Sequence, residues 1–159
     1  MDNLFTEIYE QYYKDVYRLI YSYLLNKQDT EDILQKTFTK LYKECYKFHG
    51  VDSNVKKWLF KVAINEVNDY FKLFWNKNKT YINMESISNV KNSDNEITLL
   101  VASLEKQYRL PIYLYYYEGY NISEIAKIMN KTETCIKTRL KRAKEKLKQE
   151  MEGEVYENY

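Results

Sequence analysis

The scarcity of turn-forming residues is the strongest constraint on how this chain folds. It contains only 3 Gly and 1 Pro in 159 residues. Sandwiches and barrels need many tight turns, and Gly and Pro supply the backbone geometry of such turns. Long helices joined by a few polar loops need neither residue in number. An all-α fold is therefore expected.

Apolar residues recur at spacings of three and four through the first part of the chain. Each such segment has one apolar stripe, which is typical of an amphipathic helix packed on its neighbours. Three helices are predicted, over about Asn3–Leu25, 29–48 and 55–75. Together they would form a small three-helix-type bundle, which makes residues 1–75 the first domain.

The composition changes after this bundle. The segment NKNKTYINMESISNVKNSDN is rich in Asn, Ser and Lys and has little apolar periodicity, so 76–95 is expected to be a flexible linker. A second helical domain follows at 96–150. Its first helix is predicted over about Glu96–Tyr117, bent or broken near Pro111 because proline cannot donate to the i−4 carbonyl. The remaining residues, 151–159, are an acidic tail.

The sequence ISEIAKIMNKTETCIKTRL has the pattern of a helix-turn-helix. Asn121 can cap the first helix, and Ala126 is small where two helices cross closely. Asn130 stands where the chain must adopt a left-handed conformation to leave that helix, and Thr132 can cap the next one. The turn between the two helices has the expected length of three to four residues.

The second helix of this motif is strongly basic. Its apolar residues fall within about 60° of one another on a helical wheel, as a narrow stripe made by Ile136, Leu140, Ala143 and Leu147. Such a charge run is by itself usually a solvated surface. Behind a capped and closely crossed helix, however, it favours insertion into a DNA major groove. The candidates for contact with base edges are Lys137, Thr138, Lys141 and Arg142, and those for phosphates or solvent are Arg139, Lys144, Lys146 and Lys148.

Other classes of protein are less compatible with the sequence. Cys45 and Cys135 lie far apart without a C-x-x-C pair, the single His has no partner cluster, and no phosphate loop or nucleophile motif is present. We therefore expect no metal, no cofactor and no enzymatic activity. The chain has no apolar run of membrane-spanning length and no basic secretory leader, so a cytoplasmic protein without membrane insertion is expected.

Three segments, in this order, resemble a bacterial RNA polymerase sigma factor of the extracytoplasmic-function (ECF) type. They are DTEDILQKTFTKLYK, WLFKVAINEVNDYF and YYYEGYNISEIAKIMNKTETCIKTRLKRAKEKL. The resemblance covers nearly the whole chain and implies a region 2 domain at 1–75 and a region 4 domain at 96–150. It further implies an alternative sigma factor that binds core RNA polymerase and directs promoter-specific initiation. Region 2 would open the −10 element, and region 4 would bind the −35 element as duplex.

The resemblance also implies partners and site residues. The partners would be the clamp and flap elements of core polymerase, promoter DNA and an anti-sigma factor. Polymerase binding is expected at Asp32 and Gln35. Binding to −10 DNA is expected at Phe48, His49, Ser53, Asn54 and Asn65. Binding to −35 DNA is expected at Thr134, Lys137, Thr138, Arg139, Lys141 and Arg142.

This chain departs from the family pattern at three places. Lys36 replaces the acid that usually follows the Gln, Leu104-Glu105 replaces Leu-Pro at the opening of region 4, and Thr134-Cys135-Ile136 replaces Gly-Thr-Val. One other function stays open: a stand-alone helix-turn-helix regulator that binds palindromic duplex DNA as a dimer. Several residues also have simpler interpretations, a solvated helix face for Asp32 and Gln35 and a local backbone hydrogen bond for Asn65.

Overall fold

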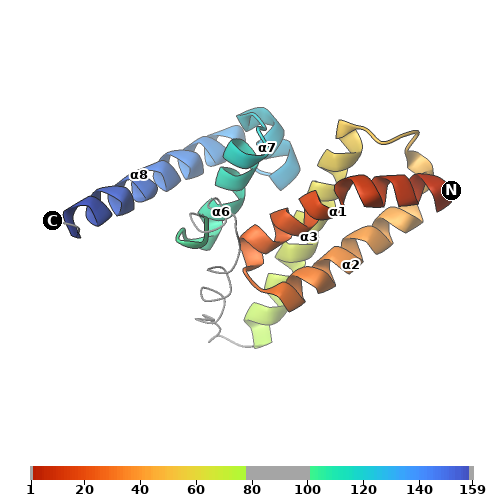
Figure 1. Ribbon diagram of the computed structural model, residues 1–159, viewed down its shortest axis with the longest axis horizontal. Helices are drawn as coiled ribbons and strands as arrows, with labels where there is room; N and C mark the ends of the chain where they lie inside the picture. The colour runs from red at the N-terminus through yellow and green to blue at the C-terminus, as the bar shows by residue number, and fades with distance from the viewer. Residues whose placement is uncertain (1, 78–100, 158–159) are drawn as a thin grey trace. The chain divides into compact units, whose positions relative to one another are not determined.

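The computed structural model describes residues 2–77 and 101–157 (Figure 1), with the side chains of 74–77, 151 and 153–157 excepted. The chain divides into two compact units, Met1–Ser86 and Ile87–Tyr159. All regular elements in the described ranges are helical, so the predicted all-α class is confirmed. From residue 78 onward, the predicted linker lies outside the described residues.

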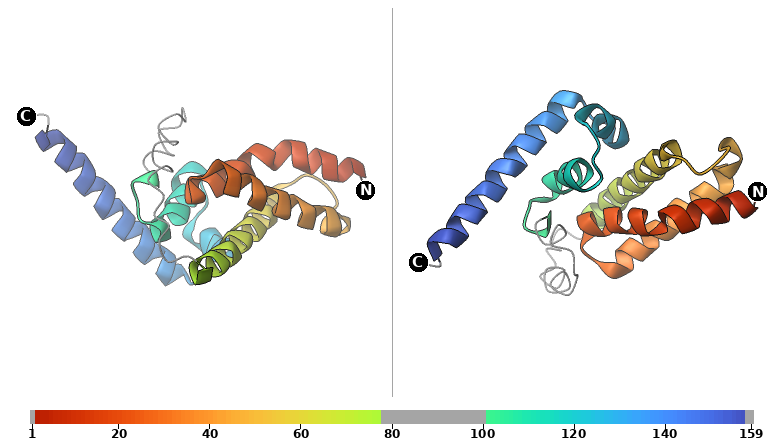
Figure 2. Two further views of the ribbon diagram at one scale, coloured as in Figure 1. Left: turned by 90° about the horizontal axis from the view of Figure 1, so that it is seen from below. Right: turned by 45° about the horizontal axis from the view of Figure 1, so that its top comes forward.

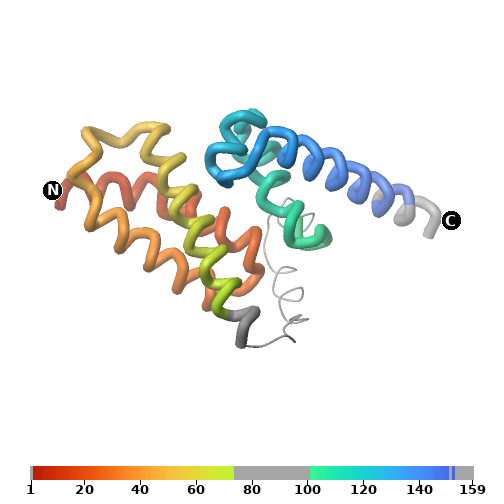
Figure 3. The backbone as a smooth tube through the Cα atoms, turned by 180° about the vertical axis from the view of Figure 1, so that it is seen from behind, coloured from red at the N-terminus to blue at the C-terminus, as the bar shows by residue number. Residues whose placement is uncertain are grey.

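The first unit is a bundle of three long helices. They are α1 (Asp2–Leu24), α2 (Lys27–Glu44) and α3 (Ser53–Lys77), with the short 3-10 helix η1 (Cys45–Lys47) after α2. Each long helix packs against the other two (Figures 1 and 3). The core residues that are at most 2% exposed include Ile8, Val16, Leu19, Ile20, Ile33, Leu41, Val55, Leu59, Phe60, Ala63, Ile64 and Val67.

Side-chain caps fix where two of these helices begin. Asn26 Oδ1 accepts a hydrogen bond from the backbone N–H of Asp29 at 3.0 Å, so α2 begins two residues before the predicted 29. For α3, Asp52 Oδ1 accepts from the N–H groups of Asn54 and Val55, both at 3.0 Å. The Tyr12 hydroxyl donates to the Asp52 carbonyl at 2.8 Å. The loop before α3 is therefore tied to α1.

The second unit contains α6 (Lys106–Ile112), the π-helical turn η2 (Tyr113–Tyr117), α7 (Ile122–Met129) and α8 (Glu133–Glu157). The long helix α8 packs against both α6 and α7 (Figure 2). The core of this second unit contains Leu104, Tyr108, Tyr113, Leu114, Ile125, Ile136, Leu140 and Ala143.

The prediction of a single helix over about Glu96–Tyr117 is wrong for residues 101–117, which are the part of this range that the structure describes. The chain is helical at 101–102, leaves the helix at 103–105, and begins α6 directly after the Leu104-Glu105 pair. The disturbance near Pro111 is confirmed. Proline has no N–H to donate and crowds the preceding turn, and two residues later the ladder widens to π spacing, with Glu118 N–H bonding to the Tyr113 carbonyl at 3.2 Å.

The last helix is longer than the predicted domain, which ended at 150. Helix α8 continues to Glu157, so the predicted acidic tail is helical over most of its length. An i,i+4 ion pair between Lys148 and Glu152 at 4.0 Å lies across the predicted boundary. Residues 158–159 lie outside the described residues.

Candidate nucleic-acid and polymerase interfaces

Three local features define the pair α7–α8: a side-chain cap at the start of α7, a left-handed residue at its end and a side-chain cap at the start of α8. Asn121 and Glu124 form a reciprocal capping box, with bonds of 2.8 Å and 3.3 Å. Asn130 is left-handed at φ 53 and ψ 49. Thr132 Oγ1 accepts from the Cys135 N–H at 3.1 Å. The predicted roles of Asn121, Asn130 and Thr132 are confirmed, and the last two set the conformation of the chain between α7 and α8.

The conformation of Asn130 gives a stability prediction. Because glycine adopts positive φ without steric cost, Asn130→Gly should leave the free energy of unfolding within about 1 kcal/mol of the parent. Asn130→Val places a β-branched residue at φ 53 and should destabilise by about 1–3 kcal/mol. Chemical denaturation followed by circular dichroism measures both. Equal stabilities of the two variants would contradict this role of Asn130.

The structure separates the two faces of α8 early in the helix. Ile136, Leu140 and Ala143 are at most 4% exposed. Five of the six predicted −35 residues are exposed, and Arg139 is half-buried. The exposed five are Thr134, Lys137, Thr138, Lys141 and Arg142. Thr138 donates its hydroxyl hydrogen to the Thr134 carbonyl at 2.9 Å, so toward solvent it can only accept.

Farther along α8, the cations have partners within the unit. Lys146 forms an ion pair with Glu105, and its ammonium lies 5.0 Å from the centre of the Tyr108 ring. A hydrogen bond with Tyr116 raises the pKa of Lys144. Lys148 likewise pairs with Glu152. The later lysines of α8 therefore contact other side chains of the same unit, whereas Lys137, Lys141 and Arg142 near its beginning are exposed. A phosphate role therefore fits Lys146 poorly.

The predicted −10 residues lie on the loop before α3 and on α3 itself. Phe48 is half-buried, and its ring packs edge-on against Trp58, with centroids 5.1 Å apart. His49, Ser53, Asn54 and Asn65 are exposed. Because Trp58 and Asn65 are seven residues apart on α3, they share one helix face. Trp58 is half-buried and was not among the residues expected at this site, although its i,i+7 spacing from Asn65 places it on the same face of α3.

A groove of about 700 Å³ runs between α2 and α3 and contains both predicted polymerase-binding residues, Asp32 and Gln35. Its lining residues are Asp32, Ile33, Gln35, Lys36, Thr39, Lys40, Lys43, Glu44, Glu66 and Tyr70. At one end, burial and a hydrogen bond with Asp29 raise the pKa of Tyr70. The sequence analysis did not identify Lys40, Glu66 or Tyr70 as residues of this groove. Lys40 could have been found, because it lies at i+8 from Asp32 and so near the same face of α2.

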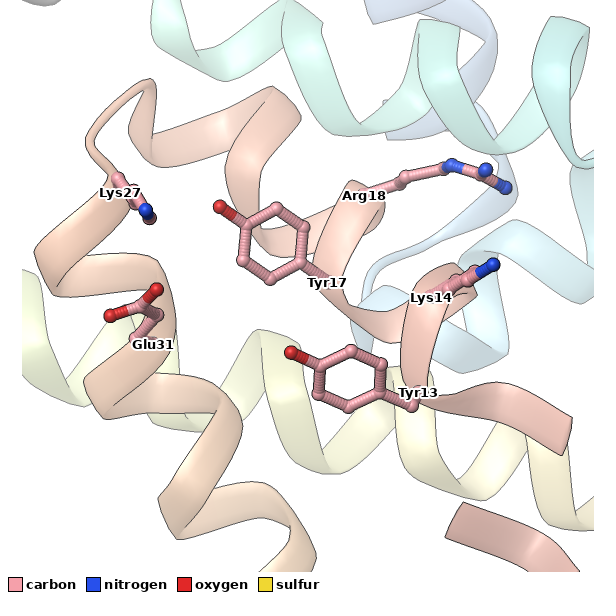
Figure 4. A pocket seen from close by; sticks show the side chains of 6 residues that line it. All are labelled: Tyr13, Lys14, Tyr17, Arg18, Lys27 and Glu31. Atoms are coloured by element: carbon pink, nitrogen blue, oxygen red, sulfur yellow. The ribbon is translucent and has the colours of Figure 1, made fainter. Parts of the chain in front are cut away.

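A smaller hollow of about 290 Å³ lies between α1 and α2 (Figure 4). The rings of Tyr13 and Tyr17 project from α1 toward α2, where Lys27 and Glu31 lie (Figure 4). Burial, and then the Glu31 carboxylate, raise the pKa of Tyr17. Tyr13 also belongs to a row of ring contacts along α1, 5.1 Å from Tyr9 and 6.5 Å from Tyr17. We interpret this hollow as part of the α1–α2 packing.

Comparison with known proteins assigns both units. Residues 8–73 match the family model for Sigma-70 region 2, and residues 94–147 match the model for Sigma-70, region 4. The chain is 34% identical over 158 residues to the ECF RNA polymerase sigma factor SigM of Bacillus subtilis (strain 168), covering 89% of this chain and 91% of that protein. The chain belongs to the ECF sigma factors. This family consists of transcription initiation factors, not classical enzymes, and the α7–α8 pair is its DNA-binding helix-turn-helix.

Two further comparisons support this ECF assignment. The ECF RNA polymerase sigma factor SigX of Bacillus subtilis (strain 168) is 24% identical, with 96% of this chain and 86% of that protein covered. The fold is similar to that of the sigma factor RpoE solved with the anti-sigma factor NepR from Bartonella quintana, at a TM-score of 0.75 and 19% identity over 93% of this chain and 96% of that chain. The region 2 match of the first unit favours a sigma factor over a stand-alone regulator.

Proposed function

We propose that this ECF sigma factor binds core RNA polymerase through α2, opens the −10 element with the end of η1, the following loop and α3, and binds the −35 element with α8. The domain limits proposed for these tasks are 1–75 and 96–150, joined by 76–95. The observation that carries the proposal is the capped turn before α8, which supports an exposed face containing Lys137, Lys141 and Arg142. Its work with polymerase and DNA would take place in the cytoplasm.

At the −35 element, the first turns of α8 would enter the major groove. Arg142 is exposed, and its planar guanidinium can donate two parallel hydrogen bonds to the O6 and N7 atoms of guanine. Lys137, Thr138 and Lys141 share this exposed side and would reach neighbouring base edges, with Thr134 at the entrance of the helix. Half-buried Arg139 is better placed for the phosphate backbone.

At the −10 element, an extruded base needs an aromatic wall and a polar group that can bind its edge. Phe48 and Trp58 offer such a wall, and the Asn65 amide offers both a donor and an acceptor. His49, Ser53 and Asn54 are exposed on the same loop and at the start of α3, where they would contact the strand on either side.

Asn65→Ala should impair strand opening while leaving binding to the −35 duplex unchanged. Loss of the edge contact is expected to cost about 1–3 kcal/mol, by analogy with base-edge contacts in duplex DNA. Permanganate reactivity of −10 thymines in the holoenzyme complex measures the opening. The matched control is Asn68→Ala, another exposed asparagine on α3 that is not among the expected −10 residues. Equal defects in both variants would contradict a specific role of Asn65.

Polymerase binding is assigned to the exposed α2 face that carries Asp32 and Gln35. An acidic group beside a polar amide suits a basic partner surface. A second proposed partner is an anti-sigma factor. The support is that the solved relative RpoE is in complex with one, NepR.

The test is to reconstitute holoenzyme from this protein and core polymerase, transcribe genomic DNA, and sequence the 5′ ends of the transcripts. Start sites should share two conserved upstream elements, centred near −10 and −35. Start sites that share neither element would contradict the proposed function.

A further inference from the structure

The groove between α2 and α3 has opposite charges at its two ends. Tyr70 near the end of α3 forms a hydrogen bond with Asp29 at the start of α2. Phe48, which follows the end of α2, contacts Trp58 near the start of α3, so the two helices run in opposite directions. Glu66 therefore lies near Asp32, one helical turn before Tyr70 on α3. Both carboxylates line the groove at this end, whereas Lys40 and Lys43 line it near the other.

The lysines of the groove form a row on α2. Lys36, Lys40 and Lys43 are spaced by four and three residues, so each repels its neighbour and lowers helix stability slightly. Among the residues that the structure describes, none of these three lysines takes part in an ion pair, and Glu44, which also lines the groove at this end, pairs with Lys47 at 3.0 Å. Lys36, Lys40 and Lys43 are exposed, which leaves their charge available to a partner.

Length and charge together specify the partner. From Asp32 to Lys43 the helix rises about 16 Å, long enough for three turns of a docked helix. A uniformly basic partner would be attracted to the Asp32 carboxylate but would be repelled by the three lysines over the rest of the groove. Like charges across an interface cost several kcal/mol.

We infer that the α2–α3 groove receives a polymerase element whose charge changes sign along its length. The element would be basic opposite Asp32 and acidic opposite Lys40 and Lys43. Lys36 would also face its acidic part. This inference rests on the proposed docking of α2 on core polymerase. It gives a role to Lys36, where the family pattern has an acid.

The deciding measurement is the affinity of labelled full-length protein for core polymerase, by fluorescence anisotropy at low and moderate salt. Lys36→Glu and Lys43→Glu should each weaken binding about tenfold at low salt and less at moderate salt. Lys43→Gln should weaken it less than Lys43→Glu. Lys72→Glu changes the same charge on an exposed part of α3 outside the groove and should have no effect.

The sign of the Lys36→Glu effect separates the two kinds of partner. A uniformly basic partner would bind this variant more tightly than the parent, which would overturn the inference. Unchanged polymerase affinity with a lower salt slope for promoter DNA would also overturn it, because the lysines would then contact phosphates. Asp32→Lys tests the underlying docking proposal. If it weakens binding while the lysine variants do not, only the inference fails, and if it has no effect, the docking proposal fails.

Discussion

Arg142→Ala is expected to weaken −35-dependent initiation and to relax the sequence preference at one position of that element. Loss of a bidentate guanine contact costs about 1–3 kcal/mol, which corresponds to roughly a 5-fold to 150-fold loss of initiation at limiting holoenzyme. The physical reason is that Arg142 is exposed in the first three turns of α8, beside the buried stripe that orients the helix. Run-off transcription from promoters with single substitutions in the −35 element measures both effects.

The matched control for this prediction is Lys148→Ala. Lys148 lies near the end of the basic segment and pairs with Glu152 at 4.0 Å. If it meets a phosphate, its loss should lower the salt slope of DNA binding by about one unit and weaken all −35 sequences alike. Equal effects of Arg142→Ala and Lys148→Ala on sequence preference would refute the assignment of base contacts to the first turns.

Leu140→Ala should destabilise the second unit by about 2–5 kcal/mol, because it removes a side chain that is only 4% exposed from the core beneath the helix-turn-helix. A loss of this size is a large fraction of the stability of a small domain. Denaturant unfolding followed by circular dichroism measures it. The control is Lys141→Ala, its exposed neighbour, which should change stability by less than about 0.5 kcal/mol.

Leu140→Ala also tests the proposed separation of tasks between the two units. Binding of the variant to core polymerase through α2 should be retained in part, whereas dependence on the −35 element should be lost. If Leu140→Ala unfolds no more easily than Lys141→Ala, the packing beneath α8 does not support the recognition face as we describe it.

The helix-turn-helix could be predicted closely from the sequence because its determinants are local. Asn121, Asn130 and Thr132 each act on backbone groups within five residues of themselves, so residue type and spacing were sufficient. The helical class was similarly accessible from the scarcity of glycine and proline and from the apolar periodicity.

Features that depend on contacts between distant segments could not be predicted in the same way. The break at 103–105 separates α6 from a preceding helical segment, although helical periodicity alone joined them. The pairing of Lys146 with Glu105 joins residues 41 apart, and the groove combines Asp32 with Glu66 from another helix. Trp58 on α3 also packs against Phe48, which lies in the preceding loop. Each requires the packed fold.

The most direct test of the central proposal is run-off transcription from a template that carries a matched −10 and −35 pair, with core polymerase alone and with this protein added. We predict a single transcript of defined length only when the protein is present, and its loss when either element is scrambled. Transcription no more specific than that of core polymerase alone would contradict the proposal that this chain directs promoter-specific initiation.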